Sequence, residues 1–194
     1  MYKVQLFIKS CFLLVCIFCY YSDALASSLS DNQANKKTAG VLYNLSKFID
    51  WPDIAFSGNQ FNICVIGDVV FLDALKTFEK RQIRGLSVSI HVLKNLSDSA
   101  NIQLFNCQTI YIDSSAKQLL PNFLTIIANK PILTISDLPD FVLLGGMIGL
   151  IQIKKRVQFA INLDATKSVN LIISAQLLRL AKTVKYNNNE ISNP

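Results

Sequence analysis

Apolar residues recur along the chain with two different periods, and together they predict a layered α/β fold. Short runs of β-branched and other apolar residues indicate buried strands, whereas apolar residues spaced three and four positions apart indicate helices. The predicted strands are Phe61–Ile66, Leu86–Leu93, Thr109–Ile112, Ile132–Ile135, Ile148–Ile153 and Val157–Ile161. The predicted helices are a first one that ends before Pro52, then Val70–Phe78, Ala116–Ala128, Asp164–Val169 and a last one capped by Ser174 and reaching Val184.

The order of these elements predicts a single mixed sheet. Strands that alternate with helices are joined by crossover connections and therefore lie parallel. The last two strands are separated only by residues 154–156, which is too short for a crossover, so they form an antiparallel hairpin. We expect a single-domain layered sandwich with a mixed, mostly parallel sheet and a C-terminal antiparallel hairpin.

The beginning of the chain has the pattern of a secretory signal peptide. Lys3 and Lys9 precede an almost wholly apolar stretch, Ser10–Tyr21, and Ala24 and Ala26 are the small residues that a signal peptidase recognises. We therefore predict cleavage after Ala26 and no stable membrane insertion afterwards. The apolar stretch of about a dozen residues is shorter than the roughly 20 that a membrane span needs, and a retained anchor is the alternative.

Composition narrows the classes of function. The chain of 194 residues is 51% hydrophobic and 16% charged, which excludes a disordered polyelectrolyte. Its net charge of +6 comes from scattered lysines and arginines without interleaved aromatic residues, so the sequence does not indicate nucleic-acid binding. The predicted segments are a signal peptide (1–26), a disordered leader (27–36), the α/β domain (37–184) and a polar tail (185–194).

Two of the five cysteines, Cys64 and Cys107, lie outside the predicted signal peptide. An even pair in an oxidising compartment is most simply a disulfide, and two buried free thiols are the alternative. Because neither belongs to a Cys-x-x-Cys arrangement, the sequence does not indicate a thiol-exchange catalyst.

The sequence lacks a recognisable catalytic or cofactor-binding pattern. His91 is the only histidine, so neither a Ser/His/Asp triad nor a two-histidine metal site can be built. Asp137 and Asp140 flank a proline, and the turn preference of Ser-Asp-x-Pro explains them. The predicted strand that ends at Gly67 lacks the glycine spacing of a dinucleotide or phosphate loop. We therefore expect a binding protein that is not an enzyme and has no catalytic residues, metal or cofactor.

The glycine-rich segment before the hairpin predicts a structural loop. Gly145, Gly146, Met147 and Gly149 lead into or lie within the predicted strand, and no helix follows them to bind an anion. Glycine adopts a positive φ at little cost, so these residues indicate a tight turn.

The only tryptophan, Trp51, is the candidate for contact with a protein partner. Continuing the first helix places it on the flank of the apolar stripe, beside Asn44 and Lys47. It either covers the core next to Pro52 or is exposed as an interface anchor. The candidate partner-binding residues are Trp51, Pro52, Lys47 and Asn44.

Several segments in order resemble the YfiR family. Residues 43–52, Tyr-Asn-Leu-Ser-Lys-Phe-Ile-Asp-Trp-Pro, are similar to the family pattern Y-N-F-x-K-F-x-x-W-P. Segments that follow in family order are Cys64–Asp68, Ser136-Asp137 with Phe141, the glycine-rich loop, Phe159–Leu163 and Ser174–Ala181. The resemblance spans roughly residues 37–184.

The resemblance implies a periplasmic protein of a Gram-negative bacterium, similar in fold to one lobe of a solute-binding protein. It implies binding to the periplasmic domain of an inner-membrane diguanylate cyclase, whose inhibition lowers cyclic-di-GMP and biofilm formation. Cys64 and Cys107 match a family disulfide position, whereas the second cysteine pair of some relatives has no counterpart here. Another membrane sensor is the alternative partner, a small-molecule receptor module is the alternative function, and a homodimer stays open.

Overall fold

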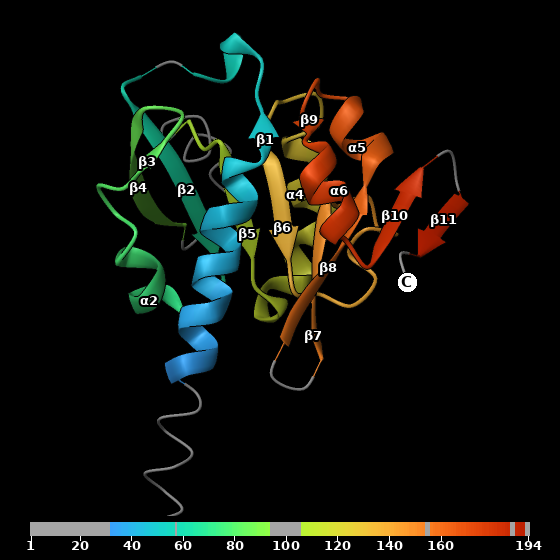
Figure 1. The fold of residues 1–194 in the computed structure, drawn as a ribbon, viewed down its shortest axis with the longest axis horizontal. Helices are drawn as coiled ribbons and strands as arrows, with labels where there is room; N and C mark the ends of the chain where they lie inside the picture. The colour runs from blue at the N-terminus through green and yellow to red at the C-terminus, as the bar shows by residue number, and fades with distance from the viewer. Residues whose placement is uncertain (1–31, 57, 94–105, 154–155, 187–188, 193–194) are drawn as a thin grey trace, which may run out of the picture.

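A nine-stranded mixed sheet forms the middle layer of the molecule (Figure 1). The computed structural model describes residues 32–56, 58–93, 106–153, 156–186 and 189–192. The strands, in sheet order, are β11 (Asn189–Ser192), β10 (Thr183–Tyr186), β8 (Arg156–Asn162), β7 (Ile148–Ile153), β6 (Leu133–Ser136), β5 (Thr109–Ile112), β2 (Gln60–Ile66), β4 (Leu86–Leu93) and β3 (Gln82–Ile83).

The strand directions confirm the predicted mixed sheet. Neighbouring strands from β4 through β2, β5 and β6 to β7 are parallel, and β7 and β8 form the predicted antiparallel hairpin. β10 returns parallel to β8, whereas β3 and β11 pair antiparallel at the two edges. Strands β5 and β6 are buried along their whole length, as expected for central strands that are covered on both faces.

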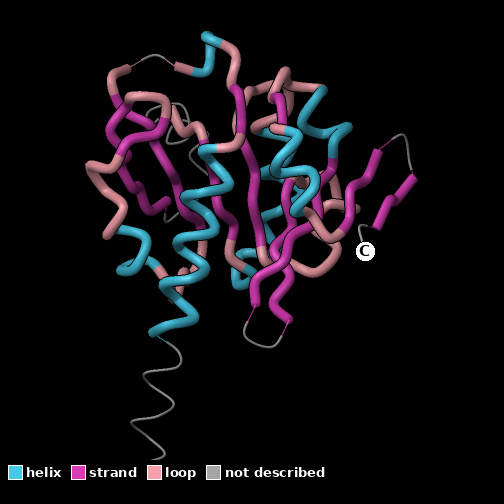
Figure 2. The backbone as a smooth tube through the Cα atoms, viewed as in Figure 1, coloured by secondary structure: helices cyan, strands magenta, loops and turns pink. Residues whose placement is uncertain are grey.

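Helices cover both faces of the sheet (Figures 1 and 2). They are a first helix (residues 32–47), η1 (Asp53–Ala55), α2 (Leu72–Lys76), η2 (Ser114–Leu119), α4 (Leu120–Ile126), α5 (Leu163–Lys167) and α6 (Ala175–Leu180). The first helix and α6 pack on one face, and η2 with α4 packs on the other. Successive side chains of β2 point to opposite faces of the sheet, so the strand contributes to the apolar core on each face. Ile63 faces the first helix, and Ile66 faces α4. Among the described residues, no helix is long and apolar enough to cross a membrane.

The first helix ends at residue 47, short of the predicted end before Pro52. Ile49–Asp50 form a short strand, β1, which pairs antiparallel with β9 (Ile172–Ile173) in a separate two-stranded sheet. The backbone N–H of Ser174 also donates to the carbonyl of Phe48, at 3.0 Å. These backbone groups bond to a distant segment, which replaces the helical hydrogen bonds that would have continued the helix.

Both ends of the domain differ from the predicted segments. Residues 32–36 are helical rather than part of a disordered leader, whereas the predicted signal peptide and residues 27–31 lie outside the described residues. The last helix begins as predicted, with the Ser174 hydroxyl accepting the N–H of Leu177, but it stops at Leu180 because Ala181 is extended. Val184 therefore lies in β10, and part of the predicted polar tail forms the β10–β11 pair.

Candidate functional site

The carboxyl edge of the parallel strands is the expected position of a ligand-binding site in a fold of this kind. In open α/β sheets, ligands bind at this edge, where the order of strands reverses. The reversal lies between β2 and β5, because β4 pairs on one side of β2 and the later strands follow on the other. The loops that leave β2 and β5 therefore decide whether a ligand fits.

The protein's own groups fill that position. Gly67, which follows β2, has φ +94°, and a Cβ there would lie 2.7 Å from the Ser115 hydroxyl oxygen. The backbone N–H of Asp68 donates to the same hydroxyl oxygen, at 2.9 Å. The two loops thus pack directly on each other where a nucleotide-binding protein would hold phosphate, in agreement with the missing glycine pattern.

A cluster of acidic and hydroxyl groups lies next to it, at the ends of β5 and β6. The Asp137 carboxylate accepts the backbone N–H of Ser114, at 2.9 Å, and is hydrogen-bonded to the Tyr111 hydroxyl. Asp113 in turn accepts the backbone N–H of Ser115, at 2.9 Å, which caps η2. Partial burial of the carboxyl group and the nearby Asp113 charge raise the pKa of Asp137. The pKa of Tyr111 is raised chiefly by burial of its hydroxyl and, to a smaller extent, by the nearby Asp137 and Asp113 carboxylates.

Asp137 thus joins two strand ends, a role that the turn interpretation did not include. Sequence reasoning missed its neighbours Asp113 and Tyr111, although an aspartate directly after a buried strand is a signal that could have found the first. Asp140 has its own role: it has φ +59°, and its carbonyl accepts the backbone N–H groups of Leu143 and Leu144. The turn interpretation therefore describes Asp140 better than Asp137.

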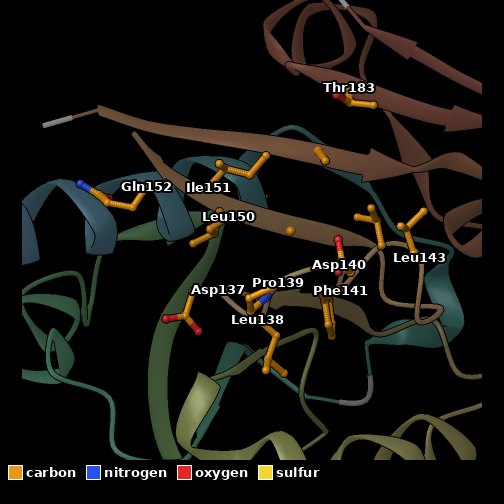
Figure 3. A pocket seen from close by; sticks show the side chains of 13 residues that line it. Asp137, Leu138, Pro139, Asp140, Phe141, Leu143, Leu150, Ile151, Gln152 and Thr183 are labelled. Carbon is orange, nitrogen blue, oxygen red and sulfur yellow. The ribbon is translucent and has the colours of Figure 1, made fainter. Parts of the chain in front are cut away.

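An open hollow of about 510 Å³ lies beside the same turn (Figure 3). Its walls are residues 137–143 on one side and β7, β8 and Thr183 on the other. Apolar side chains such as Phe141 and Ile151 dominate it, and Leu143 on its wall is 53% exposed. Asp137 and Asp140 are the two charged side chains in its lining. The shape and lining suit an apolar ligand or an apolar side chain of a partner.

The glycine-rich segment fixes the loop that borders this hollow. Gly145 has φ +102°, as the predicted tight turn requires. Gly146 lies against the ring of Phe141, which occupies the space of a Cβ, and Gly149 faces Val142. Met147 is buried, and its backbone N–H donates to the Thr134 hydroxyl at 3.0 Å.

Trp51 covers the core and is not an exposed anchor. Its side chain is 4% exposed, its ring N–H donates to the carbonyl of Gln108 at 3.3 Å, and its ring meets Phe61 edge to face. Of the two alternatives for Trp51, the structure therefore supports the one in which it covers the core, because the chain leaves the helix at Lys47 and turns inward through β1. Asn44 and Lys47 are exposed and Pro52 is partly exposed, so their part in partner binding stays a prediction.

Around Lys47, three exposed cations lie over aromatic rings. Tyr43 of the first helix and Phe78 stack with ring centres 4.7 Å apart. Lys47 lies over the Tyr43 ring at 5.7 Å, and Arg81 lies over the Phe78 ring at 4.9 Å. We call Lys47, Arg81 and Arg84, with the rings of Tyr43, Phe78 and Phe56 beneath them, the cation–aromatic surface. Sequence reasoning missed it, because its members come from separate segments without a local pattern.

The predicted disulfide is present. Cys64 in β2 is bonded to Cys107, 43 residues later, and both are buried against the α4 side of the sheet. The bond ties β2 to the segment that enters β5. Among the described residues, no group of three acidic, histidine or cysteine side chains is placed to hold a metal ion.

Comparison with known proteins identifies the family. A family model described as YfiR/HmsC-like matches residues 18–182, a range that contains every element from β1 to α6 and both disulfide cysteines. A comparison with curated proteins finds no match. Since the family match covers most of the 194 residues, the chain belongs to the YfiR/HmsC-like family.

Proposed function

We propose that this protein is a non-enzymatic periplasmic regulator that binds the periplasmic domain of an inner-membrane sensor. In this proposal the sensor is a diguanylate cyclase, and binding holds it inactive and lowers cyclic-di-GMP. The observation that carries the proposal is the family match over residues 18–182, because the family supports a periplasmic regulator of cyclic-di-GMP signalling.

Two features of the structure support parts of this proposal. The buried Cys64–Cys107 disulfide fits a protein that folds in an oxidising compartment such as the periplasm. The packing of Ser115 against Gly67 fills the position where an α/β enzyme would hold a phosphate-bearing cofactor, which favours a binding role over catalysis.

Inhibition needs no chemical step. A protein that binds the inactive conformation of the cyclase more tightly than the active one shifts the population towards the inactive state. A shift from 1:99 to 99:1 requires about a 10⁴-fold difference in affinity between the two conformations. We propose that Asn44, Lys47 and Pro52 lie in the contact, while Trp51 supports them from the core.

The test measures intracellular cyclic-di-GMP in the native host with the gene deleted and then restored. Deletion is expected to raise cyclic-di-GMP, wild type to lower it again, and Cys64→Ser to lower it poorly because the fold is less stable. An Asn44→Asp/Lys47→Glu variant is expected to fold normally and to repress poorly, and Lys117→Glu/Gln118→Glu, exposed on the opposite face, is the control with the same change of charge. Unchanged cyclic-di-GMP on deletion contradicts the proposed regulation of a cyclase.

A small-molecule receptor module is the second candidate function, favoured by the hollow beside Asp137 and Phe141. A receptor of this kind would bind an apolar or aromatic compound there and pass the signal to a membrane sensor. A thermal-shift screen with indole and small aromatic acids tests it, since a ligand that binds the folded state raises the melting temperature. A shift that disappears in Ile151→Glu supports the receptor, whereas binding to a sensor domain without any ligand supports the regulator.

A further inference from the structure

The cation–aromatic surface is built from four segments that converge on one side of the first helix. Tyr43 and Lys47 come from that helix, Phe78 and Arg81 from the turn after α2, Phe56 from the segment after η1, and Arg84 from the loop between β3 and β4. The Tyr43 hydroxyl donates to the carbonyl of Gln82 at 3.0 Å, which attaches the turn to the helix. Because Tyr43 and Phe78 stack on each other, the cations lie over their outer faces.

The backbone under the cations is fixed by hydrogen bonds. The N–H of Lys80 donates to the carbonyl of Val88 at 3.0 Å, and the N–H of Val88 donates to the carbonyl of Arg81 at 2.7 Å. The turn is thereby held to β4. A cation on such a backbone loses less conformational entropy on binding than one on a free loop, and this preorganisation favours affinity.

Arg84 occupies a position that is unfavourable for arginine. It has φ +53°, is followed by Gly85 at φ +79°, and these two residues form the loop between β3 and β4. Both central residues of such a hairpin turn have positive φ, which favours asparagine, aspartate or glycine. An arginine at such a strained position points to a role for its side chain outside the turn. The guanidinium lies 5.8 Å from the centre of the Phe56 ring.

The charges on this surface are partly unpaired. Arg84 donates to the Asp50 carboxylate at 2.7 Å. In the part of the chain that the structure describes, neither Lys47 nor Arg81 forms an ion pair. The Arg84–Asp50 contact shows the chemistry that suits the surface, since guanidinium groups bind carboxylates through paired N–H donors.

We infer that the cation–aromatic surface binds an acidic segment of a protein partner, with carboxylates of the partner on Lys47, Arg81 and Arg84. The inference rests on the proposed function and names the chemistry of its partner. Arginine and aromatic side chains together are typical of residues that dominate the energy of protein interfaces. The exposed acidic residues Asp50 and Glu79 interrupt the positive charge of this surface, so spaced carboxylates on a protein fit it better than a uniformly anionic lipid surface does.

Binding to fluorescein-labelled poly-L-glutamate at low ionic strength tests the surface. The surface variant is Lys47→Gln/Arg81→Gln/Arg84→Asn, and the matched control removes the same charge elsewhere, as Lys117→Gln/Arg156→Gln/Arg179→Gln. Wild type is expected to bind and to release the polymer as salt is added. The surface variant is expected to bind about tenfold more weakly and the control within about twofold of wild type.

The single variant Arg84→Asn shows whether weaker binding results from the lost charge or from a less stable fold. Asparagine suits the left-handed turn, so this variant is expected to melt at or above the wild-type temperature and still to bind about threefold more weakly. Equal losses in the surface and control variants, or no binding by wild type, overturn the inference. So does binding to phosphatidylglycerol vesicles that depends on these cations while poly-L-glutamate does not bind.

The same variants in the native host separate this inference from the proposed function. If deletion raises cyclic-di-GMP and the surface variant restores repression as well as wild type does, the surface inference fails and the regulatory function stands. If deletion leaves cyclic-di-GMP unchanged, the proposed function fails, and the polymer experiment alone decides what the surface binds. If the surface variant fails to repress while wild type and the control variant repress normally, the result supports both the proposed function and the surface inference.

Discussion

The hydroxyl oxygens of Ser46 and Thr109 lie 3.0 Å apart inside the core and join the first helix to the central strand β5. Both side chains are fully buried. The Ser46 hydroxyl also donates to the carbonyl of Leu42 at 3.1 Å, so the hydrogen between the two hydroxyls comes from Thr109. The pair fixes how the helix is placed along the sheet, which apolar contacts alone leave less strictly determined.

Ser46→Ala is expected to lower the free energy of unfolding by about 1–3 kcal/mol, because the buried Thr109 hydroxyl loses its acceptor. Adding Thr109→Val is expected to recover most of that loss, since replacing both partners by apolar groups leaves no unpaired donor. Urea unfolding of the two single variants and the double variant measures the coupling. A double variant with the summed loss of the single variants would contradict the prediction.

Asp137 is expected to make stability depend on pH. Its pKa in the folded state is raised, so the folded state binds the proton more tightly than the unfolded chain does. The stabilisation is therefore full below the unfolded pKa of about 4 and is lost as the pH rises through the raised folded pKa. Asp137→Asn removes this slope, and urea unfolding from about pH 3.5 to 7 measures it.

The comparison also controls for the single histidine. Burial lowers the pKa of His91, so His91 contributes a stability change of opposite sign near its ordinary pKa. Taking the difference between wild type and Asp137→Asn at each pH cancels that contribution. Parallel curves for the two proteins would rule out Asp137 as the source of the slope.

Gly67→Ala tests the closed contact between the loops after β2 and β5. Alanine there has both an unfavourable positive φ and a Cβ only 2.9 Å from the Cβ of Asp113. Gly85→Ala is the matched control, since φ is +79° but nothing lies within 4 Å of the added carbon. We expect about 1 kcal/mol of destabilisation for the control and roughly 2–4 kcal/mol for Gly67→Ala, measured by thermal unfolding. Equal losses would mean that the loops do not pack as described.

Removing the disulfide is expected to lower stability without removing the fold. For a closed segment of 43 residues, the chain-entropy model gives an upper value of about 4 kcal/mol. Cys64→Ala/Cys107→Ala and wild type with dithiothreitol should therefore unfold at similar, lower urea concentrations. The double variant should no longer respond to dithiothreitol, and a remaining response would mean that the reductant acts elsewhere.

The elements that were predicted correctly are those that a local pattern of residues determines. Leu86–Leu93, Thr109–Ile112 and Ile148–Ile153 have the predicted bounds, because each is an apolar run bounded by turn residues. The parallel order and the antiparallel hairpin followed from connection lengths. The Cys64–Cys107 bond followed from the number of cysteines outside the signal peptide.

Elements that depend on distant pairing could not be predicted in this way. β1 and β9 are two residues long and exist only because they pair with each other. The same pairing ended the first helix early and turned Trp51 inward, so the helical wheel could not decide between its exposed and core-covering alternatives. The candidate surface residues Asn44 and Lys47 are exposed, but Arg81 and Arg84 joined them only through the tertiary fold.

The β1–β9 pair can form only late in the synthesis of the chain. The first helix is made early, yet its end is held by Ile172–Ile173, about 120 residues later in the chain. Contacts of such long range form slowly, because the loop between them must be closed before they stabilise anything. The backbone of Ile49 and Asp50 therefore stays unpaired until almost the whole chain has emerged, and a nascent chain stopped before β9 would expose this end of the first helix to chaperones and proteases.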